Sequence, residues 1–142
     1  MYILVDTNVF LDLILERGDL SNSAKEFFKN AVKAKCRLYL SSNSIRDIGY
    51  IVSHIYHDSS KGKSAQMRAY ELCHKVVSFT NDDAIEALYS NVDDYEDAVL
   101  VEIAKRELID LIVTNNIKDF KNANFPVWTP EHFNKVISNT HI

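Results

Sequence analysis

Short apolar runs alternate along the chain with longer stretches whose apolar residues recur at helical spacing. The apolar runs lie at residues 2–5, 37–40, 76–79, 111–113 and 126–128. Each is typical of a short strand buried on both faces. The stretches between them predict amphipathic helices. One such helix presents a predicted buried stripe of Ile45, Ile48, Val52 and Ile55.

Capping residues and glycines predict where some helices begin and end. Asp6 follows the first strand and can cap the next helix, which we expect to end at Gly18. A second helix is expected to begin at Ser21 or Ser23. The polar segment 58–64 (DSSKGKS) predicts a loop before a fourth helix.

The alternation of strands and helices predicts an α/β fold. Parallel strands joined by helices form a sheet that is covered on both faces. We therefore expect a three-layer α/β/α arrangement with a central, mostly parallel sheet of four to five short strands. At 142 residues, the whole chain (1–142) is expected to form a single domain.

Composition narrows the class of protein further. The formal net charge of −4 argues against a passive nucleic-acid-coating protein, which would usually be basic. It does not argue against an enzyme whose acidic side chains bind a metal ion. Cys36 and Cys73 are far apart in sequence and predict free thiols in a reducing compartment. Because neither a signal peptide nor a membrane span is evident, we expect a cytoplasmic protein that does not insert into membranes.

Several polar side chains should meet at one edge of the predicted sheet. Asp6 follows the first strand, Asp97 begins the helix before the fourth strand, and Asn116 and Asp119 follow the fourth strand. In parallel sheets, ligands bind beyond the carboxyl ends of the strands. Asp47, near the start of its helix, is placed where it can reach the same crevice.

Each acid could also play an ordinary structural role. Asp6 can be a helix cap, Asp94 and Asp97 are spaced like a capping pair, Asp47 can be a solvated helix residue, and Asp119 can be a turn residue. Their convergence is the stronger indication. Carboxylates that lie close together repel one another, and Mg²⁺ or Mn²⁺ relieves that repulsion because both prefer hard oxygen ligands.

Two other candidate sites are less well supported. His54 and His57, with Asp58 beside them, could begin a transition-metal site, but the further ligands needed to complete it are not evident. A basic group can be either a phosphate-contacting face or a solvated helix face, and the second interpretation is favoured. That group comprises Lys25, Lys29, Lys33, Lys35 and Arg37. No glycine-rich phosphate loop is present in the sequence.

Four segments give the chain a family resemblance. They are VDTNVFLDLI (5–14), SSNSIRDI (41–48), DYEDAVLVEIAKRELIDLIVTNNIKDF (94–120) and VWTPEHF (127–133). With these segments the chain resembles a PIN domain, the metal-dependent ribonuclease fold that includes the toxins of VapBC toxin–antitoxin pairs. The resemblance covers essentially the whole chain.

The resemblance assigns roles to the acids position by position. Asp6 and Asp97 match the family's first and third acids, and Asp47 matches the second, which is more often Glu. Asn116 falls where many members carry a fourth acid, although a sizeable subset has asparagine there. Asp119 either supplies the missing carboxylate or is structural. The resemblance thus implies catalytic roles for the four aspartates.

The resemblance also implies supporting residues. Asn8 and Thr114 match polar positions that orient the acids, and Asn116 and Asp94 complete the expected surroundings of the site. The implied metal is Mg²⁺ or Mn²⁺, held by Asp6 and Asp97 with Asp47 as a further ligand. One metal or two is left open.

The implied function is a metal-dependent endoribonuclease that hydrolyses RNA phosphodiester bonds. The implied partners are an RNA substrate, an antitoxin protein and a second copy of the chain in a homodimer. A stand-alone RNA-processing enzyme is an open alternative to the toxin. A catalytically inactive PIN-like module that binds RNA or protein is another, motivated by Asn116. A receiver-like signalling domain fits worse, because Asp6 is followed by Thr7 and not by a second acid.

Overall fold

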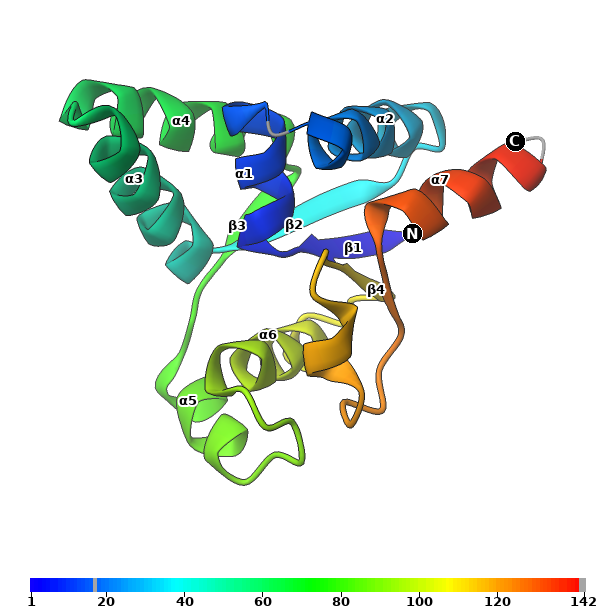
Figure 1. Ribbon diagram of the computed structural model, residues 1–142. Helices are drawn as coiled ribbons and strands as arrows, with labels where there is room; N and C mark the ends of the chain where they lie inside the picture. The colour runs from blue at the N-terminus through cyan, green and yellow to red at the C-terminus, as the bar shows by residue number, and fades with distance from the viewer. Residues whose placement is uncertain (17, 141–142) are drawn as a thin grey trace.

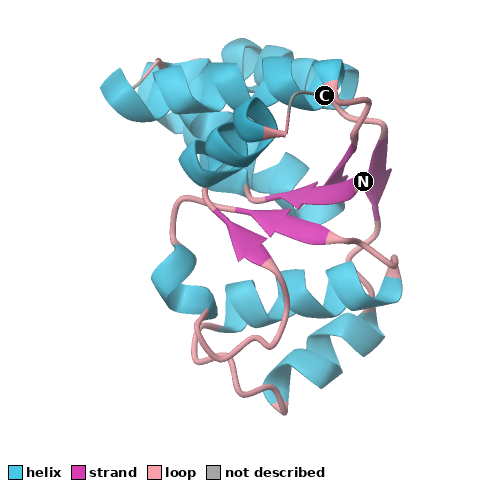
Figure 2. Cartoon of the chain, turned by 90° about the vertical axis from the view of Figure 1, so that its right-hand side faces the viewer, coloured by secondary structure: helices cyan, strands magenta, loops and turns pink. Residues whose placement is uncertain are grey.

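The computed structural model describes residues 1–16 and 18–140. A five-stranded parallel sheet lies between two layers of helices (Figure 1; Figure 2). The strands are β1 (Tyr2–Val5), β2 (Arg37–Ser41), β3 (Lys75–Val77), β4 (Leu111–Val113) and β5 (Val127–Trp128). The helices are α1 (Thr7–Leu15), α2 (Gly18–Lys33), α3 (Ser42–Tyr56), α4 (Ser59–Leu72), α5 (Asn81–Leu88), α6 (Tyr95–Arg106) and α7 (Pro130–Asn139), with a 3₁₀ helix η1 (Ile117–Phe120).

The order of the strands determines where a ligand site can form. The sheet runs β3-β2-β1-β4-β5, and all of its pairings are parallel. From β1 the chain builds outward to β2 and β3, and then returns to add β4 and β5 on the other side. Crevices form outside the carboxyl ends of strands where the order reverses in this way. The reversal lies between β1 and β4, which pair with Val5 opposite Val113.

Alternating side chains along the strands build two hydrophobic cores. In β1, Ile3 and Val5 pack with the layer of α1, α2, α3, α4 and α7, whereas Leu4 packs with the layer of α5 and α6 (Figure 1). In β4, Ile112 likewise belongs to the second core. Each side chain buried in this way stabilises the fold by about 1.5–3 kcal/mol. The predicted α/β sandwich is therefore confirmed. None of the helices in the described ranges has the length and apolar character needed to cross a bilayer.

The expected loop at 58–64 is wrong, because this segment forms the first part of α4. Asp58 caps the helix, and its Oδ1 accepts a hydrogen bond of 2.9 Å from the backbone N–H of Ser60. A cap of this kind overrides the weak helix propensity of serine and glycine. Gly62 lies inside α4 at a position where α3 leaves no room for a side chain.

The expected break between α1 and α2 also differs in detail. α1 ends with Glu16 in the left-handed conformation (φ 51°), and Gly18 begins α2, so neither Ser21 nor Ser23 starts that helix. On α3, the predicted stripe includes one exposed member, since Ile55 is 47% exposed. Ile55 lies near the end of α3, beyond the part of the helix that the core covers.

α3 and α4 pack closely because a glycine of each helix lies at their interface, Gly49 against Gln66 and Gly62 against Ser53. A Cβ atom added at Gly62 would lie 1.9 Å from Ser53 Oγ and 2.6 Å from the carbonyl oxygen of Gly49. A side chain at Gly62 therefore has no room without separating the helices. Gln66 joins the pair further along, where its Nε2 donates a hydrogen bond of 2.9 Å to the carbonyl oxygen of Ile45.

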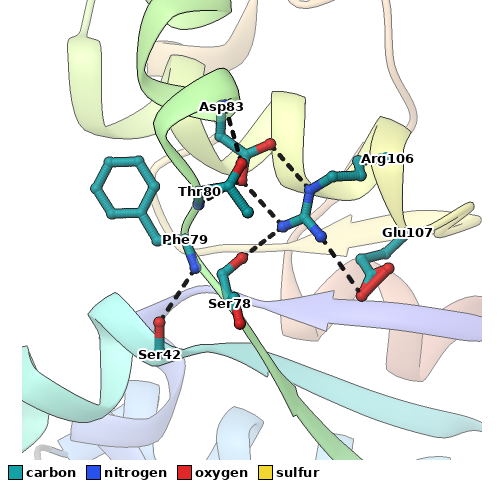
Figure 3. A network of polar contacts seen from close by, with 7 residues as sticks. All are labelled: Ser42, Ser78, Phe79, Thr80, Asp83, Arg106 and Glu107. Carbon is teal, nitrogen blue, oxygen red and sulfur yellow. Dashed lines mark hydrogen bonds and ion pairs between the residues drawn. The ribbon is translucent and has the colours of Figure 1, made fainter.

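A polar network ties the end of α6 to the start of α5 (Figure 3). Arg106 donates from Nε and Nη2 to the two carboxylate oxygens of Asp83, at 3.0 and 2.9 Å. Asp83 also accepts from the backbone N–H of Thr80 at 2.9 Å, within a complete capping box. This network fixes the end of α6 relative to the start of α5, and the other end of α6 carries Asp97.

Candidate metal-binding active site

A pocket of about 250 Å³ opens at the carboxyl edge of the sheet. It lies where the reversal of strand order predicts a ligand site. Three of the predicted acids, Asp6, Asp47 and Asp97, line it together with Asn8 and Asn116. The other lining residues are Thr7, Leu11, Ser41, Asn43, Ser44, Ile51, Glu96, Val99 and Leu100.

Asp6 is buried and held by three hydrogen bonds. Its Oδ1 accepts from the backbone N–H of Thr7 at 2.7 Å, which caps α1. Its Oδ2 accepts from the hydroxyl of Thr114 at 2.8 Å and from Asn8 Nδ2 at 3.3 Å. Burial raises the pKa of Asp6, while the hydrogen bonds from Thr114 and Thr7 oppose that rise. The hydrogen bonds therefore fix the orientation of the carboxylate but offset only part of the effect of burial on its pKa.

The loop after β4 is held against α1 by amide and hydroxyl groups. Asn8 donates from Nδ2 to Thr114 Oγ1 at 3.3 Å and accepts from the backbone N–H of Asn115 at 3.1 Å. The Asn115 side chain also donates to the buried carboxylate of Asp12. Thr114 Oγ1 accepts from the backbone N–H of Asn116 at 3.1 Å. These bonds place the Asn116 amide at the pocket.

Asp97 enters the pocket from the first turn of α6. Asp94 caps this helix and accepts a hydrogen bond of 3.1 Å from the backbone N–H of Asp97. Burial raises the pKa of Asp97 to about 7, and repulsion from Asp6, Asp94 and Asp119 adds to the rise. A cation beside a carboxylate raised in this way would favour its charged form.

Asp47 lies on α3, across the pocket from α6. Ser41 caps α3 by accepting from the backbone N–H of Ser44 at 3.1 Å, and Thr7 Oγ1 donates to Ser44 Oγ at 2.8 Å. This hydroxyl chain joins the start of α3 to the start of α1. Asp47 forms an ion pair of 3.6 Å with Arg46, whose side chain is 79% exposed. An ion pair so open to solvent is weak.

Asp119 and Asp94 lie beside the pocket and do not line it. Both border a neighbouring cavity of about 300 Å³, with Asp93, Lys118, Lys121 and Asn122. Asp119 is still near enough to Asp97 to raise its pKa. The structure thus brings together three of the four predicted acids and leaves Asp119 in an adjacent position.

The donor set of the pocket suits a hard dication. Among the described residues that line it, none is Lys, Arg or His. Within residues 1–16 and 18–140, no three His, Cys, Asp or Glu side chains already stand as a group able to hold a metal ion. The described residues of the pocket therefore do not form a site in which protein side chains alone surround the ion. Mg²⁺ commonly binds through one or two carboxylates and keeps several waters, which matches an open, carboxylate-lined pocket.

The side chains of the two weaker candidate sites make ordinary structural contacts. The His54 and His57 rings are 6.2 Å apart, and Asp58 is engaged in capping α4. In the basic group, Lys25 and Lys29 form ion pairs with Glu16 and Glu26.

The remaining members of the basic group and the cysteines lie away from the pocket. Lys35 precedes β2 and Arg37 begins it, at the edge of the sheet opposite the pocket. Cys36 and Cys73 are free, and each packs against the first core.

Sequence reasoning missed some residues of the pocket. Glu96 adds a fourth carboxylate to the lining, and Asn43 adds an amide. Ser41 and Ser44, at the start of α3, also line the pocket. The available signal for Glu96 was its place next to Asp97 in the first turn of α6.

Comparison with known proteins identifies the family. The family model described as PIN domain matches residues 2–118, and the chain belongs to this family. The predicted family is therefore confirmed. A search of curated proteins finds no match.

Solved structures share the fold. A chain of VapBC2 from Rickettsia felis, bound to a promoter DNA fragment, is 19% identical, with a TM-score of 0.64 over 91% of this chain and 98% of that chain. FitAcB from Neisseria gonorrhoeae is 17% identical, with a TM-score of 0.69 over 92% and 99%. Mycobacterium tuberculosis VapC20, described as a sarcin-ricin loop cleaving toxin, is 16% identical, with a TM-score of 0.60 over 84% and 95%. At these identities the likeness concerns the fold.

Proposed function

We propose that this chain is a metal-dependent endoribonuclease that hydrolyses RNA phosphodiester bonds. The observation that carries the proposal is the carboxylate-lined pocket at the strand reversal, with Asp6, Asp47 and Asp97 on its walls. The family and the toxins among the structural neighbours support the same function.

The residues of the pocket fit Mg²⁺ or Mn²⁺. Asp6 and Asp97 would hold the ion, with Asp47 as a further ligand directly or through water. When bound, such an ion lowers the pKa of water to give a nucleophile at neutral pH and stabilises charge on the scissile phosphate.

The chain's own residues orient the acids, and the charge of these acids makes RNA binding depend on a dication. Thr114 and Asn8 hold the Asp6 carboxylate in one direction, and the Asp94 cap fixes the first turn of α6 beneath Asp97. Without a dication, the carboxylates repel a phosphodiester. We therefore expect the affinity for RNA to depend on added Mg²⁺ or Mn²⁺.

The test is a Mn²⁺-dependent cleavage assay across RNA classes. Wild-type protein should cleave at least one class, whereas Asp6→Asn and Asp97→Asn should fold normally and lose cleavage. Asp19→Asn, an exposed acid at the start of α2, is the matched control and should retain activity. Wild-type cleavage by the Asp6→Asn/Asp97→Asn double variant would contradict the assignment.

We further propose that the protein is the toxin of a type II toxin–antitoxin pair, acting in the cytoplasm with an antitoxin partner and as a homodimer. The toxin–antitoxin complexes among its structural neighbours support this role. Expression of the wild-type protein alone should arrest growth, and Asp6→Asn should not. An upstream reading frame that encodes a DNA-binding segment and a helical tail should relieve the arrest.

A catalytically inactive binding module is the second candidate. It is favoured by Asn116, which brings a neutral amide to the pocket where many family members carry an acid. Calorimetry separates the two functions. Binding of Mg²⁺ or Mn²⁺ by wild-type protein, lost in Asp6→Asn, supports the nuclease, and no binding at millimolar concentration supports the inactive module.

A further inference from the structure

α3 carries a row of exposed rings on the side of the helix that continues from the pocket. This ring stripe consists of Tyr50 and His54 on α3 and of His57, which caps the C-terminus of the helix. The Tyr50 and His54 rings are parallel to within 10°, with centroids 6.1 Å apart, and the His54 and His57 centroids are 6.2 Å apart. Tyr50 is 72% exposed, and both histidines are also exposed. The Tyr50 and His54 rings are therefore stacked, the His57 ring is tilted by 54° to that of His54, and all three side chains are exposed to solvent.

Helical spacing connects the ring stripe to the pocket. Asp47 and Ile51 form part of the pocket wall contributed by α3. Tyr50 follows Asp47 by three residues and His54 follows it by seven, so all of them share one side of the helix. At a rise of 1.5 Å per residue, His54 lies about 10 Å beyond Asp47 along α3. A strand leaving the pocket along this helix would pass over the rings.

Stacking is the interaction with RNA that this surface offers. Aromatic side chains accept unstacked bases of single-stranded RNA, and every base has a face that can stack. Stacking needs no positive charge, which suits a chain with a net charge of −4 and an acidic pocket. The exposed Arg46 side chain lies one helical turn before Tyr50 and adds a cation for the adjoining phosphate.

We propose that Tyr50 and His54 form a base-stacking platform for single-stranded RNA beside the acidic pocket. The proposal rests on the proposed ribonuclease function and deepens it, because it names the two residues that position the RNA strand beside the pocket. The stacked base fixes the register of the strand, so that one phosphate enters the pocket. Tyr50 and His54 are thus positioning residues that act on the bound strand.

Fluorescence anisotropy with a labelled single-stranded RNA of about 12 nucleotides tests the platform. Binding is measured in Ca²⁺, an oxygen-binding dication with looser geometry, and a gel verifies that the RNA stays intact. Tyr50→Ala should weaken binding about tenfold, and His54→Ala should act in the same direction. Tyr50→Phe keeps the ring and should bind within about twofold of wild type. Tyr89→Ala, which removes an 84% exposed ring from the end of α5, is the matched control.

An abasic scan identifies the stacked nucleotide. The same RNA is prepared with the base removed at each position in turn. At one position or two adjacent positions, the difference between wild type and Tyr50→Ala should disappear, because the ring has no base to contact. An undiminished difference at every position would overturn the stacking assignment.

Other outcomes separate this inference from the proposed function. If wild type binds and cleaves RNA but Tyr50→Ala matches it in affinity and in KM, the platform is wrong and the nuclease stands. If Tyr50→Ala changes the oligomeric state while RNA affinity is unchanged, the ring stripe is an interface with a second copy. If wild type neither binds nor cleaves any RNA, the proposed function itself fails.

Discussion

Thr114 donates a hydrogen bond of 2.8 Å to Asp6, although the two residues are 108 positions apart in the chain. Each follows the last residue of its strand, and Val5 and Val113 are direct partners in the sheet. The Thr114 side chain is completely buried, and its hydroxyl oxygen also accepts hydrogen bonds from Asn8 Nδ2 and from the backbone N–H of Asn116. The pairing of β1 with β4 therefore fixes the orientation of the most buried carboxylate in the pocket.

Thr114→Val should reduce metal-dependent cleavage by about tenfold or more, because residues that orient ligands typically contribute that much to metal affinity or activity. The change keeps the shape of the side chain and removes the hydrogen bond that lowers the pKa of Asp6. Calorimetry with Mn²⁺ and initial cleavage rates measure the effect. Thr114→Ser retains the hydroxyl and should recover most of the loss. Equal activity of the Val and wild-type proteins would contradict the role of this bond.

Asp97→Asn should stabilise the metal-free protein at pH 8. The pKa of Asp97 is raised from its ordinary value of 3.8 to about 7, mainly by burial and by repulsion from Asp6. Between these values the folded state binds more protons than the unfolded state, so the free energy of unfolding falls as pH rises. Asparagine carries no charge and avoids this loss.

Melting temperatures in EDTA measure this effect. The variant should melt a few degrees above wild type at pH 8. The difference should shrink toward pH 4, because Asp97 is then protonated in the folded state and about half protonated in the unfolded state. Adding Mn²⁺ at pH 8 should stabilise wild type more than the variant. Asp19→Asn should behave like wild type throughout. A lower melting temperature for Asp97→Asn in EDTA at pH 8 would contradict the repulsion.

Gly62→Ala should destabilise the protein by about 2 kcal/mol, as expected when a tightly packed contact is overfilled. The added Cβ would meet Ser53 Oγ and the carbonyl oxygen of Gly49, so α3 and α4 would have to separate. This sign is opposite to the usual gain from Gly to Ala inside a helix. Urea unfolding measures the change, and Lys63→Ala, at an exposed position of α4, should be nearly neutral.

Arg106→Met should lower the free energy of unfolding by about 2 kcal/mol at pH 7, since it removes charged hydrogen bonds to Asp83. Burial alone would raise the pKa of Asp83, but the hydrogen bonds from Arg106 and Thr80 lower it. A lowered pKa gives stability that is present above the ordinary value of 3.8 and is lost as pH falls through the folded value. The difference between wild type and variant should therefore shrink below about pH 4 in acid titrations. A constant difference down to pH 2 would exclude the ionised pair as its source.

Much of the fold could be predicted from local sequence. The strand expected at 111–113 matches β4 at both ends. Polar residues that precede an apolar periodic stretch are typical helix caps. Four of the observed caps are of this kind: Asp6, Thr80, Asp94 and Thr129. The α4 start was missed because the serines, lysines and glycine of 58–64 favour a loop locally. Packing of Gly62 against α3 outweighs that local preference.

The candidate site was predictable only in outline. Asp6 and Asp97 follow from their places after a strand and at a helix start. The adjacent position of Asp119 depends on how η1 turns away from β4, which no local pattern encodes. Glu96 precedes Asp97 in the first turn of α6, and only the position of α6 in the folded chain brings both residues to the pocket.

The sequence by itself determined the alternation of strands and helices, the caps and the identity of the acids, because these depend on residue type and spacing over a few positions. Only the tertiary structure decided which acids share a pocket, how Thr114 orients Asp6 and where the ring stripe runs. Those relationships join residues distant in the chain, and the pairing of β1 with β4 and the packing of α3 and α6 create them.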